Sequence, residues 1–172
     1  SKKEKVNSDL QAAQFNLLMT MAVGAGYEHY EISNLALPGM KSKHNSSYWN
    51  GASYLGVGPS AHSYHQTIRS WNISNNLSYM QSIEKNERPF ESETLSEIDQ
   101  LNEYIMTKLR LEEGMYKQEI ESRWGNQLVS TISMRLERHI QNGKVENTES
   151  GWKLTNSGKF FADGIAADLF QV

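Results

Sequence analysis

The sequence predicts an α+β fold in two parts, and three patterns carry that prediction. Apolar residues recur at helical spacing from Asp9 to Gly24. The segment from Tyr27 to Ser33 then alternates with a period of two, as strands do. After Phe90 the order becomes helix, helix, helix, two short strands and a final helix, which is the order of a winged-helix domain. We therefore expect the end of an α/β, barrel-like domain at residues 1–75 and a mainly helical, winged-helix-like domain at residues 76–172.

The first predicted helix has recognisable ends. Ser8 or Asp9 is expected to cap its start, and Gly24 and Gly26 are expected to stop it. Helix followed by strand is the repeat of an α/β barrel, so we interpret residues 1 to about 35 as the last unit of such a domain. A barrel strand without its neighbours exposes unpaired backbone groups, which predicts pairing with other parts of this chain or with a second copy in a homodimer.

The predicted strand carries one carboxylate, Glu31. Alternation places Glu31 and Ser33 on one face, and Tyr30, Ile32 and Asn34 on the other. A carboxylate at the end of a barrel strand can orient a substrate, or it can hold the loop that follows. Because Glu31 has no identifiable acid/base partner, the structural role is favoured.

The middle of the chain is expected to be mostly loop. Pro38-Gly39 marks a turn, and 42–50 is predicted to form a loop or a single helical turn. Strands are predicted at 52–57 and 63–71, and a helix at 76–85.

The second part contains the clearest helical patterns. Thr94 or Ser96 caps a helix with periodic apolar residues that ends by Gly114; these residues are Ile98, Leu101, Ile105, Met106 and Leu109. Two more helices are predicted at 117–124 and 126–141, the latter with five residues inward, namely Leu128, Val129, Ile132, Leu136 and Ile140. A hairpin of 145–147 and 151–154 and a helix at 157–170 complete the pattern.

Composition excludes several classes of function. The chain has no cysteine, which excludes disulfides, thiol nucleophiles and thiolate-bound metals or iron–sulfur clusters. A net charge of −3 predicts no nucleic-acid partner. No apolar run approaches the roughly 20 residues of a transmembrane helix, and no signal peptide is present, so a cytoplasmic location is expected. The opening Ser-Lys-Lys-Glu-Lys suggests a cut inside a longer protein.

Three elements concentrate histidine, glycine and aromatic residues. They are Tyr30-Glu31-Ile32-Ser33-Asn34, His44-Asn45-Ser46-Ser47-Tyr48-Trp49 and Tyr54-Leu55-Gly56-Val57-Gly58-Pro59-Ser60-Ala61-His62-Ser63. Together they strongly resemble the oxygen-independent coproporphyrinogen III oxidase-like family of radical SAM proteins. The HNxxYW pattern of the second element looks like the haem-binding motif of the family's haem chaperone branch, HemW. The resemblance spans nearly the whole chain but only the C-terminal part of the family.

The resemblance implies cofactors that this chain cannot hold by itself. Family members carry three closely spaced cysteines that bind a [4Fe-4S] cluster, which cleaves S-adenosylmethionine. Since the chain has no cysteine, we expect the cluster and S-adenosylmethionine only in the full-length protein, and we expect the fragment alone to be inactive. The barrel-like unit predicted above is then the end of a radical SAM domain.

His44 is the candidate haem-iron ligand, because a neutral imidazole on an exposed loop can reach a metal. Tyr48 and Trp49 would lie against the porphyrin, with Asn45 beside them. The alternative is that His44 and Asn45 stabilise a turn while the aromatic residues pack on the core. Met40, His62 or His65 could supply or compete for an iron ligand.

The Gly56-Val57-Gly58-Pro59 loop resembles a phosphate-binding loop only superficially, because Pro59 lacks an N–H and no P-loop lysine follows. Similarity to the family implies that Gly56, Gly58 and His62 lie beside the substrate or haem cavity. Tight turns and a satisfied histidine are the equally weighted alternative.

Three functions follow, in order of preference. The first is haem binding and transfer to a haem-accepting protein, as the HemW resemblance implies. The second is the oxidative decarboxylation of coproporphyrinogen III to protoporphyrinogen IX in haem biosynthesis. The third is a non-catalytic winged-helix interaction module. DNA binding is disfavoured because the helix predicted at 126–141, which would be the candidate reader helix that contacts the bases, sets Glu137 between Arg135 and Arg138.

Overall fold

The computed structural model describes residues 7–172 and has mixed helices and strands, which confirms the α+β class. It forms two compact units. The first unit combines the chain up to Ser42 with Tyr104–Phe170, and the second comprises Lys43–Glu103 with the last two residues. The domain boundary predicted between residues 75 and 76 falls inside the second unit. That boundary stays a prediction.

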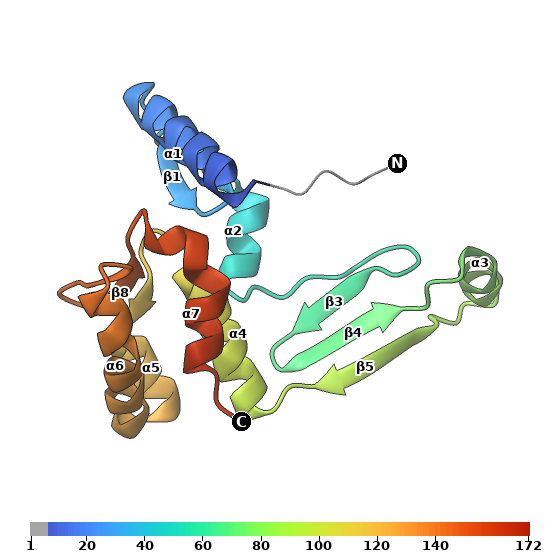
Figure 1. Ribbon diagram of the computed structural model, residues 1–172. Coiled ribbons are helices and arrows are strands. Elements are labelled where there is room, and N and C mark those ends of the chain that lie inside the picture. The colour runs from blue at the N-terminus through green and yellow to red at the C-terminus, as the bar shows by residue number, and fades with distance from the viewer. Residues whose placement is uncertain (1–6) are drawn as a thin grey trace. The chain divides into compact units, whose positions relative to one another are not determined.

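The first helix forms as predicted, as α1 (Ser8–Gly24) (Figure 1). Its cap is Asn7, whose side-chain oxygen accepts hydrogen bonds from the amides of Asp9 and Leu10, both at 3.1 Å. The prediction of Ser8 or Asp9 as the cap was therefore wrong. The asparagine that precedes them satisfies the free amides of the first turn.

The predicted strand is shorter than expected and turns back on itself. It forms β1 (Glu28–Glu31), which pairs antiparallel with β2 (Asn34–Ala36). Extension of the strand to Ser33 was wrong, because Ile32 and Ser33 form the turn of this hairpin. The expectation that β1 pairs with another part of this chain is confirmed. Within the described residues its partners are antiparallel, so membership of a parallel barrel stays a prediction.

The winged-helix-like arrangement is present in the first unit. Its elements are α4 (Glu97–Leu109), which crosses from the second unit, β6 (Met115–Tyr116), α5 (Lys117–Trp124), α6 (Asn126–Gln141), β7 (Val145–Asn147), β8 (Gly151–Leu154), the 3₁₀ helix η1 (Gly158–Phe161) and α7 (Ala162–Leu169). The sheet order is β6-β8-β7. The sequence pattern missed β6, which has only two residues. The predicted last helix is divided into η1 and α7.

The core of this arrangement lies between α4, α5, α6, α7 and the sheet. Its fully buried side chains are Ile105, Leu109, Met115, Ile120, Ile132, Leu136, Trp152, Ile165 and Leu169. Among the residues predicted to face inward, Ile98 and Met106 are exposed, while Leu128, Val129 and Ile140 are half-buried. Ser96 caps α4 as predicted: its hydroxyl accepts from the Asp99 amide at 3.1 Å, and the Asp99 carboxylate accepts from the Ser96 amide at 3.0 Å.

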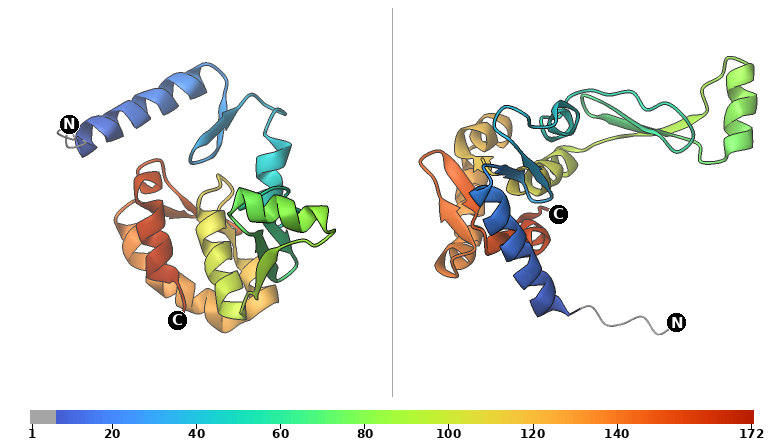
Figure 2. Two further views of the ribbon diagram at one scale, coloured as in Figure 1. Left: turned by 90° about the vertical axis from the view of Figure 1, so that its right-hand side faces the viewer. Right: turned by 90° about the horizontal axis from the view of Figure 1, so that it is seen from above.

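The second unit is built on a three-stranded antiparallel sheet. It contains α2 (Lys43–Trp49), β3 (His62–His65), β4 (Ile68–Asn72), α3 (Asn76–Glu84) and β5 (Phe90–Thr94), with sheet order β3-β4-β5. Within this unit, α3 sits at the far end of the arm formed by β4 and β5 (Figures 1 and 2).

Two strand predictions in this unit were wrong. The predicted strand at 63–71 is a hairpin, because Gln66 adopts a positive φ of 55° and turns the chain between β3 and β4. The predicted strand at 52–57 makes a single bridge, between Tyr54 and Tyr64. The sequence pattern missed β5, since all of its residues are exposed and none of its faces is apolar.

Candidate functional site

The HNxxYW element forms α2, a helix of seven residues. The His44 carbonyl accepts a hydrogen bond from the Ser47 hydroxyl at 2.7 Å, which closes the first turn. The His44 ring is exposed, and no group in residues 7–172 hydrogen-bonds to its ring nitrogens. Asn45 is half-buried and engaged by neighbouring groups. The imidazole of His44 is thus free to bind a metal that approaches from solvent.

A row of aromatic rings leads from His44 to the sheet. The His44 and Tyr48 rings meet edge to face with centroids 5.0 Å apart, as residues four apart on a helix can. Tyr48 contacts Tyr54 at 4.7 Å, and Tyr54 lies 6.2 Å from Tyr64 on β3. Burial, followed by the proximity of Tyr48, raises the pKa of Tyr54 above its ordinary value. We call His44, Tyr48, Tyr54 and Tyr64 the aromatic row.

Trp49 ends α2 and is half-buried. Its indole N–H is inaccessible to solvent and has no hydrogen-bond partner among the described residues. A buried donor without an acceptor is costly, at about 1–3 kcal/mol. The HNxxYW element therefore contains two groups without a hydrogen-bond partner among the described residues. They are the indole N–H of Trp49 and the imidazole of His44.

The glycine loop is held by protein groups. Asn72, which is buried, donates to the carbonyls of Gly56 at 3.3 Å and Gly58 at 2.9 Å. The Gly56 amide donates to the Ser63 hydroxyl at 3.0 Å, and the Gly58 amide to the Tyr79 hydroxyl at 3.3 Å. A Cβ on Gly56 would lie 2.1 Å from the His62 carbonyl oxygen, so only glycine fits there. These contacts favour a structural role for the loop.

The other histidines differ in whether their rings are exposed and free of hydrogen bonds, as a metal ligand requires. His62 is exposed, with its ring 6.2 Å from that of Trp71 at the edge of a cavity of about 330 Å³. His65 is hydrogen-bonded through Nδ1 to the Ser53 hydroxyl at 3.1 Å. In the first unit, His29 and His139 are buried and hydrogen-bonded, while Met40 is exposed.

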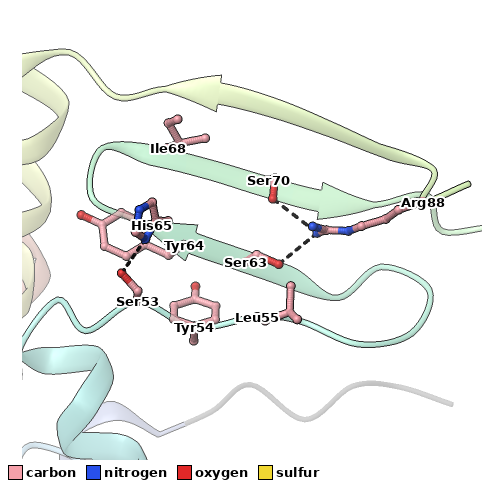
Figure 3. Close-up of a pocket in the computed structure, with 9 residues that line it drawn as sticks. All are labelled: Ser53, Tyr54, Leu55, Ser63, Tyr64, His65, Ile68, Ser70 and Arg88. Atoms are coloured by element: carbon pink, nitrogen blue, oxygen red, sulfur yellow. Dashed lines mark hydrogen bonds between the residues drawn. The ribbon is translucent and has the colours of Figure 1, made fainter.

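A pocket of about 420 Å³ opens on the second-unit sheet (Figure 3). Its lining residues are Ser53, Tyr54, Leu55, Ser63, Tyr64, His65, Ile68, Ser70 and Arg88. Figure 3 shows Arg88 reaching over the sheet toward Ser63 and Ser70. The sequence pattern did not single out Arg88, because it lies in a polar connection far from the motifs.

Comparisons with known proteins show which proteins this chain resembles. The family model described as the HemN C-terminal domain matches residues 95–161. A protein named heme chaperone HemW from Lactococcus lactis is 30% identical over 169 residues, covering 92% of this chain and 44% of that protein. Its namesake from Bacillus subtilis is 29% identical, covering 90% of this chain and 41% of that protein. The chain is a HemW/HemN-like segment.

A solved structure shares the fold of this HemW/HemN-like segment. The structure titled coproporphyrinogen III oxidase (HemN) from Escherichia coli, a radical SAM enzyme, matches with a TM-score of 0.75 and 15% identity. The match covers 99% of this chain and 43% of that one. The segment thus spans less than half the length of these relatives.

The residues of the segment do not suit an iron–sulfur cluster, because the chain has no cysteine to supply thiolate ligands. In residues 7–172, no three histidine, aspartate or glutamate side chains gather where they could hold a metal ion. None of the helices in that range has the length and apolar character needed to span a bilayer.

Proposed function

We propose that the HemW/HemN-like segment binds haem at α2 and the aromatic row, within a cytoplasmic protein that passes haem to an acceptor protein. The observation that carries the proposal is the His44 imidazole, which is exposed and has no hydrogen-bond partner in the described residues. The names of the HemW relatives give independent support for haem as the cargo.

Haem suits a site that offers a single strong ligand. The porphyrin supplies four nitrogens, so the protein needs only one or two axial ligands. A free metal ion usually requires three or more protein ligands, and the described residues hold no such group. A lone histidine therefore favours haem over a bare metal ion.

The surroundings of His44 suit a flat, largely apolar ligand. Tyr48 and Tyr54 present ring surface beside the imidazole, and such faces pack well against a porphyrin. We assign Tyr48 and Trp49 to ring contact and Asn45 to the adjoining rim. His62 is the candidate for a second axial position, and Gly56 and Gly58 shape the loop that precedes it.

The test compares histidine variants of the full-length protein in haem titrations. His44→Ala should remove the axial bond, shift the Soret band and weaken haem binding, while leaving stability within about 0.5 kcal/mol, since the side chain is exposed. His65→Ala is the matched control, because His65 is also exposed but is bound to Ser53. Tyr48→Ala should weaken retention more gradually through lost ring contact.

An unchanged spectrum and affinity in His44→Ala would remove His44 as the ligand. It would also favour the oxidation of coproporphyrinogen III, because that reaction needs no iron ligand in the HNxxYW element. If His62→Ala alone changed the spectrum, the axial role would move to His62.

A further inference from the structure

Arg88 is held on the second-unit sheet by three neutral side chains (Figure 3). Its Nε donates to the Asn72 side-chain oxygen at 2.9 Å, and its Nη2 donates to the hydroxyls of Ser63 at 3.1 Å and Ser70 at 3.5 Å. The guanidinium also lies over the Phe90 ring at 4.7 Å. Ser63, Ser70 and Asn72 are all buried, so they fix the orientation of the guanidinium.

The charge of Arg88 has no counter-charge in residues 7–172, where no carboxylate lies within salt-bridge distance of it. Arg69, on β4, differs in this respect, because it pairs with Glu93 at 3.3 Å and with Glu103. The Nη1 group of Arg88 donates to none of the described residues. Arg88 therefore presents an oriented cation with two N–H bonds that an anion can accept.

Ser63 and Ser70 add hydroxyl donors to this group. The Ser63 oxygen accepts from the Gly56 amide at 3.0 Å and from Arg88 at 3.1 Å, so both of its lone pairs are engaged and only its proton is left. No residue in the described range accepts the proton of either serine. The two side chains are only 7% and 8% exposed. Since a buried donor without an acceptor is costly, this arrangement favours a ligand that accepts hydrogen bonds.

These donors lie on the face of the sheet that does not carry the aromatic row. In the register of β3 and β4, Ser63 is opposite Ser70 and Tyr64 is opposite Arg69. Because successive side chains of a strand point to opposite faces, both serines lie on one face and the Tyr64 ring on the other. Tyr54 forms a bridge with Tyr64, so its ring shares the face of Tyr64. A ligand of Arg88 is therefore separate from haem bound against the aromatic row.

The pocket that Arg88 lines suits a single negative charge on an apolar body. Among the described residues of its lining, Arg88 supplies a fixed positive charge and none is acidic, while Leu55 and Ile68 are 70% and 47% exposed. One cation matches a carboxylate better than a phosphate monoester, which carries about 1.5 to 2 negative charges at neutral pH. Nη1 and the two serine hydroxyls together offer as many hydrogens as a carboxylate has lone-pair sites, about four.

We propose that Arg88, Ser63 and Ser70 bind the carboxylate of a small organic acid whose aliphatic part lies against Leu55 and Ile68. This site is distinct from the proposed haem site and does not depend on it. A carboxylate can also come from an aspartate or glutamate elsewhere in the full-length protein, because the segment spans less than half the length of its relatives. The experiment separates these two sources.

The experiment titrates the full-length protein with hexanoate and with hexanamide, which has nearly the same shape but no charge, and follows the backbone amide signals by NMR. The wild type should bind hexanoate about 10-fold or more tightly than hexanamide, as expected for hydrogen bonds to a charged group. Acetate should bind more weakly than hexanoate, because it lacks the chain that contacts Leu55 and Ile68. Hexyl phosphate should bind no more tightly than hexanoate.

Two arginine variants locate the binding. Arg88→Gln should lower the affinity for hexanoate to that for hexanamide, since glutamine keeps hydrogen-bond donors but carries no charge. Arg69→Gln is the matched control, because Arg69 lies on the other face and does not line the pocket. It should keep the preference for hexanoate.

Equal affinity of the wild type for acid and amide, or no saturable binding of hexanoate, would overturn the proposal. If hexanoate does not bind and Arg88→Gln also loses stability in denaturant titrations, the occupant is a carboxylate of the protein and not a free acid. Tighter binding of hexyl phosphate than of hexanoate would overturn the assignment of a carboxylate. The wild-type comparison is decisive even if Arg88→Gln fails to fold.

Discussion

Lys159 Nζ donates a hydrogen bond to His29 Nδ1 across 2.9 Å, so η1 is linked to β1 by two groups that can both carry positive charge. His29 Nε2 donates to the Ile32 carbonyl oxygen at 2.9 Å, which leaves Nδ1 as the acceptor of a neutral imidazole. Burial lowers the pKa of both side chains, and the Lys159 charge lowers that of His29 further. Protonation of His29 would remove the acceptor and place two cations in contact.

This pair predicts a loss of stability in mild acid. Because the pKa of His29 is lowered on folding, the unfolded chain binds more protons than the folded protein between that lowered pKa and about 6.5. The free energy of unfolding should therefore fall as the pH drops from 7.5 to 5.5. The nearby carboxylates of Glu112 and Glu31 raise the pKa of His29, but the net shift of that pKa is downward. Urea unfolding at several pH values checks this, and His29→Gln should show a flatter dependence. If the free energy of unfolding depended on pH as steeply in His29→Gln as in the control His65→Gln, the prediction would be wrong.

The Glu31–Arg110 pair should be a major contributor to stability. Glu31 is 1% exposed, accepts from Arg110 at 2.8 Å and 2.9 Å, and accepts from the Ser33 amide at 2.9 Å. The structural role predicted for Glu31 is thereby confirmed. Arg110→Ala should lower the free energy of unfolding by about 3–5 kcal/mol, because it leaves a buried carboxylate unpaired.

Two further variants test whether the loss of stability in Arg110→Ala comes from the buried charge of Glu31. Lys153→Ala, which breaks an exposed pair with Glu146, should cost about 1 kcal/mol or less. Adding Glu31→Gln to Arg110→Ala should recover part of the loss, since it removes the buried charge. Denaturant titrations compare the variants. If Arg110→Ala lowered the free energy of unfolding no more than Lys153→Ala, the Glu31–Arg110 pair would contribute only as much as an exposed ion pair.

Gly56 should tolerate no side chain. Gly56→Ala would place a methyl group 2.1 Å from the His62 carbonyl oxygen, so we expect a loss of about 1–3 kcal/mol. Gly24→Ala is the control, because nothing lies within 4 Å of its Cβ position and alanine favours a helix. Thermal unfolding of both variants measures the difference. Equal melting temperatures would show that the glycine loop can move away from β3.

The cations of the candidate reader helix α6 are occupied within the first unit. Arg135 donates to the carbonyls of Leu169 at 3.2 Å and Phe170 at 3.0 Å, and Arg138 pairs with Asp168 at 2.6 Å. We therefore expect duplex DNA binding at physiological salt to be non-specific, with a Kd on the order of 10⁻⁴ M or weaker. Fluorescence anisotropy in a salt titration tests this expectation. Sequence-selective binding would favour the winged-helix interaction module instead.

Local patterns predicted the elements whose stability comes from near neighbours in the chain. The bounds of α5, α6, β7 and β8 match the prediction, because helical periodicity and turn residues mark them directly. The polar strand β5 carries no such pattern, since its order comes from pairing with β4. Gln66 shows the same limit, because a turn formed by a non-glycine residue with positive φ has no strong signal in the chain.

The sequence by itself determined the α+β class, the absence of a thiolate cluster and the identity of the HNxxYW residues, since composition and short motifs are properties of the chain. Only the tertiary structure decided which of these side chains remain available. It left the rings of His44 and His62 without hydrogen-bond partners among the described residues, occupied those of His29, His65 and His139, and oriented Arg88 over Ser63. The reason is physical: hydrogen bonding and burial are set by contacts between residues distant in sequence, and no local pattern records them.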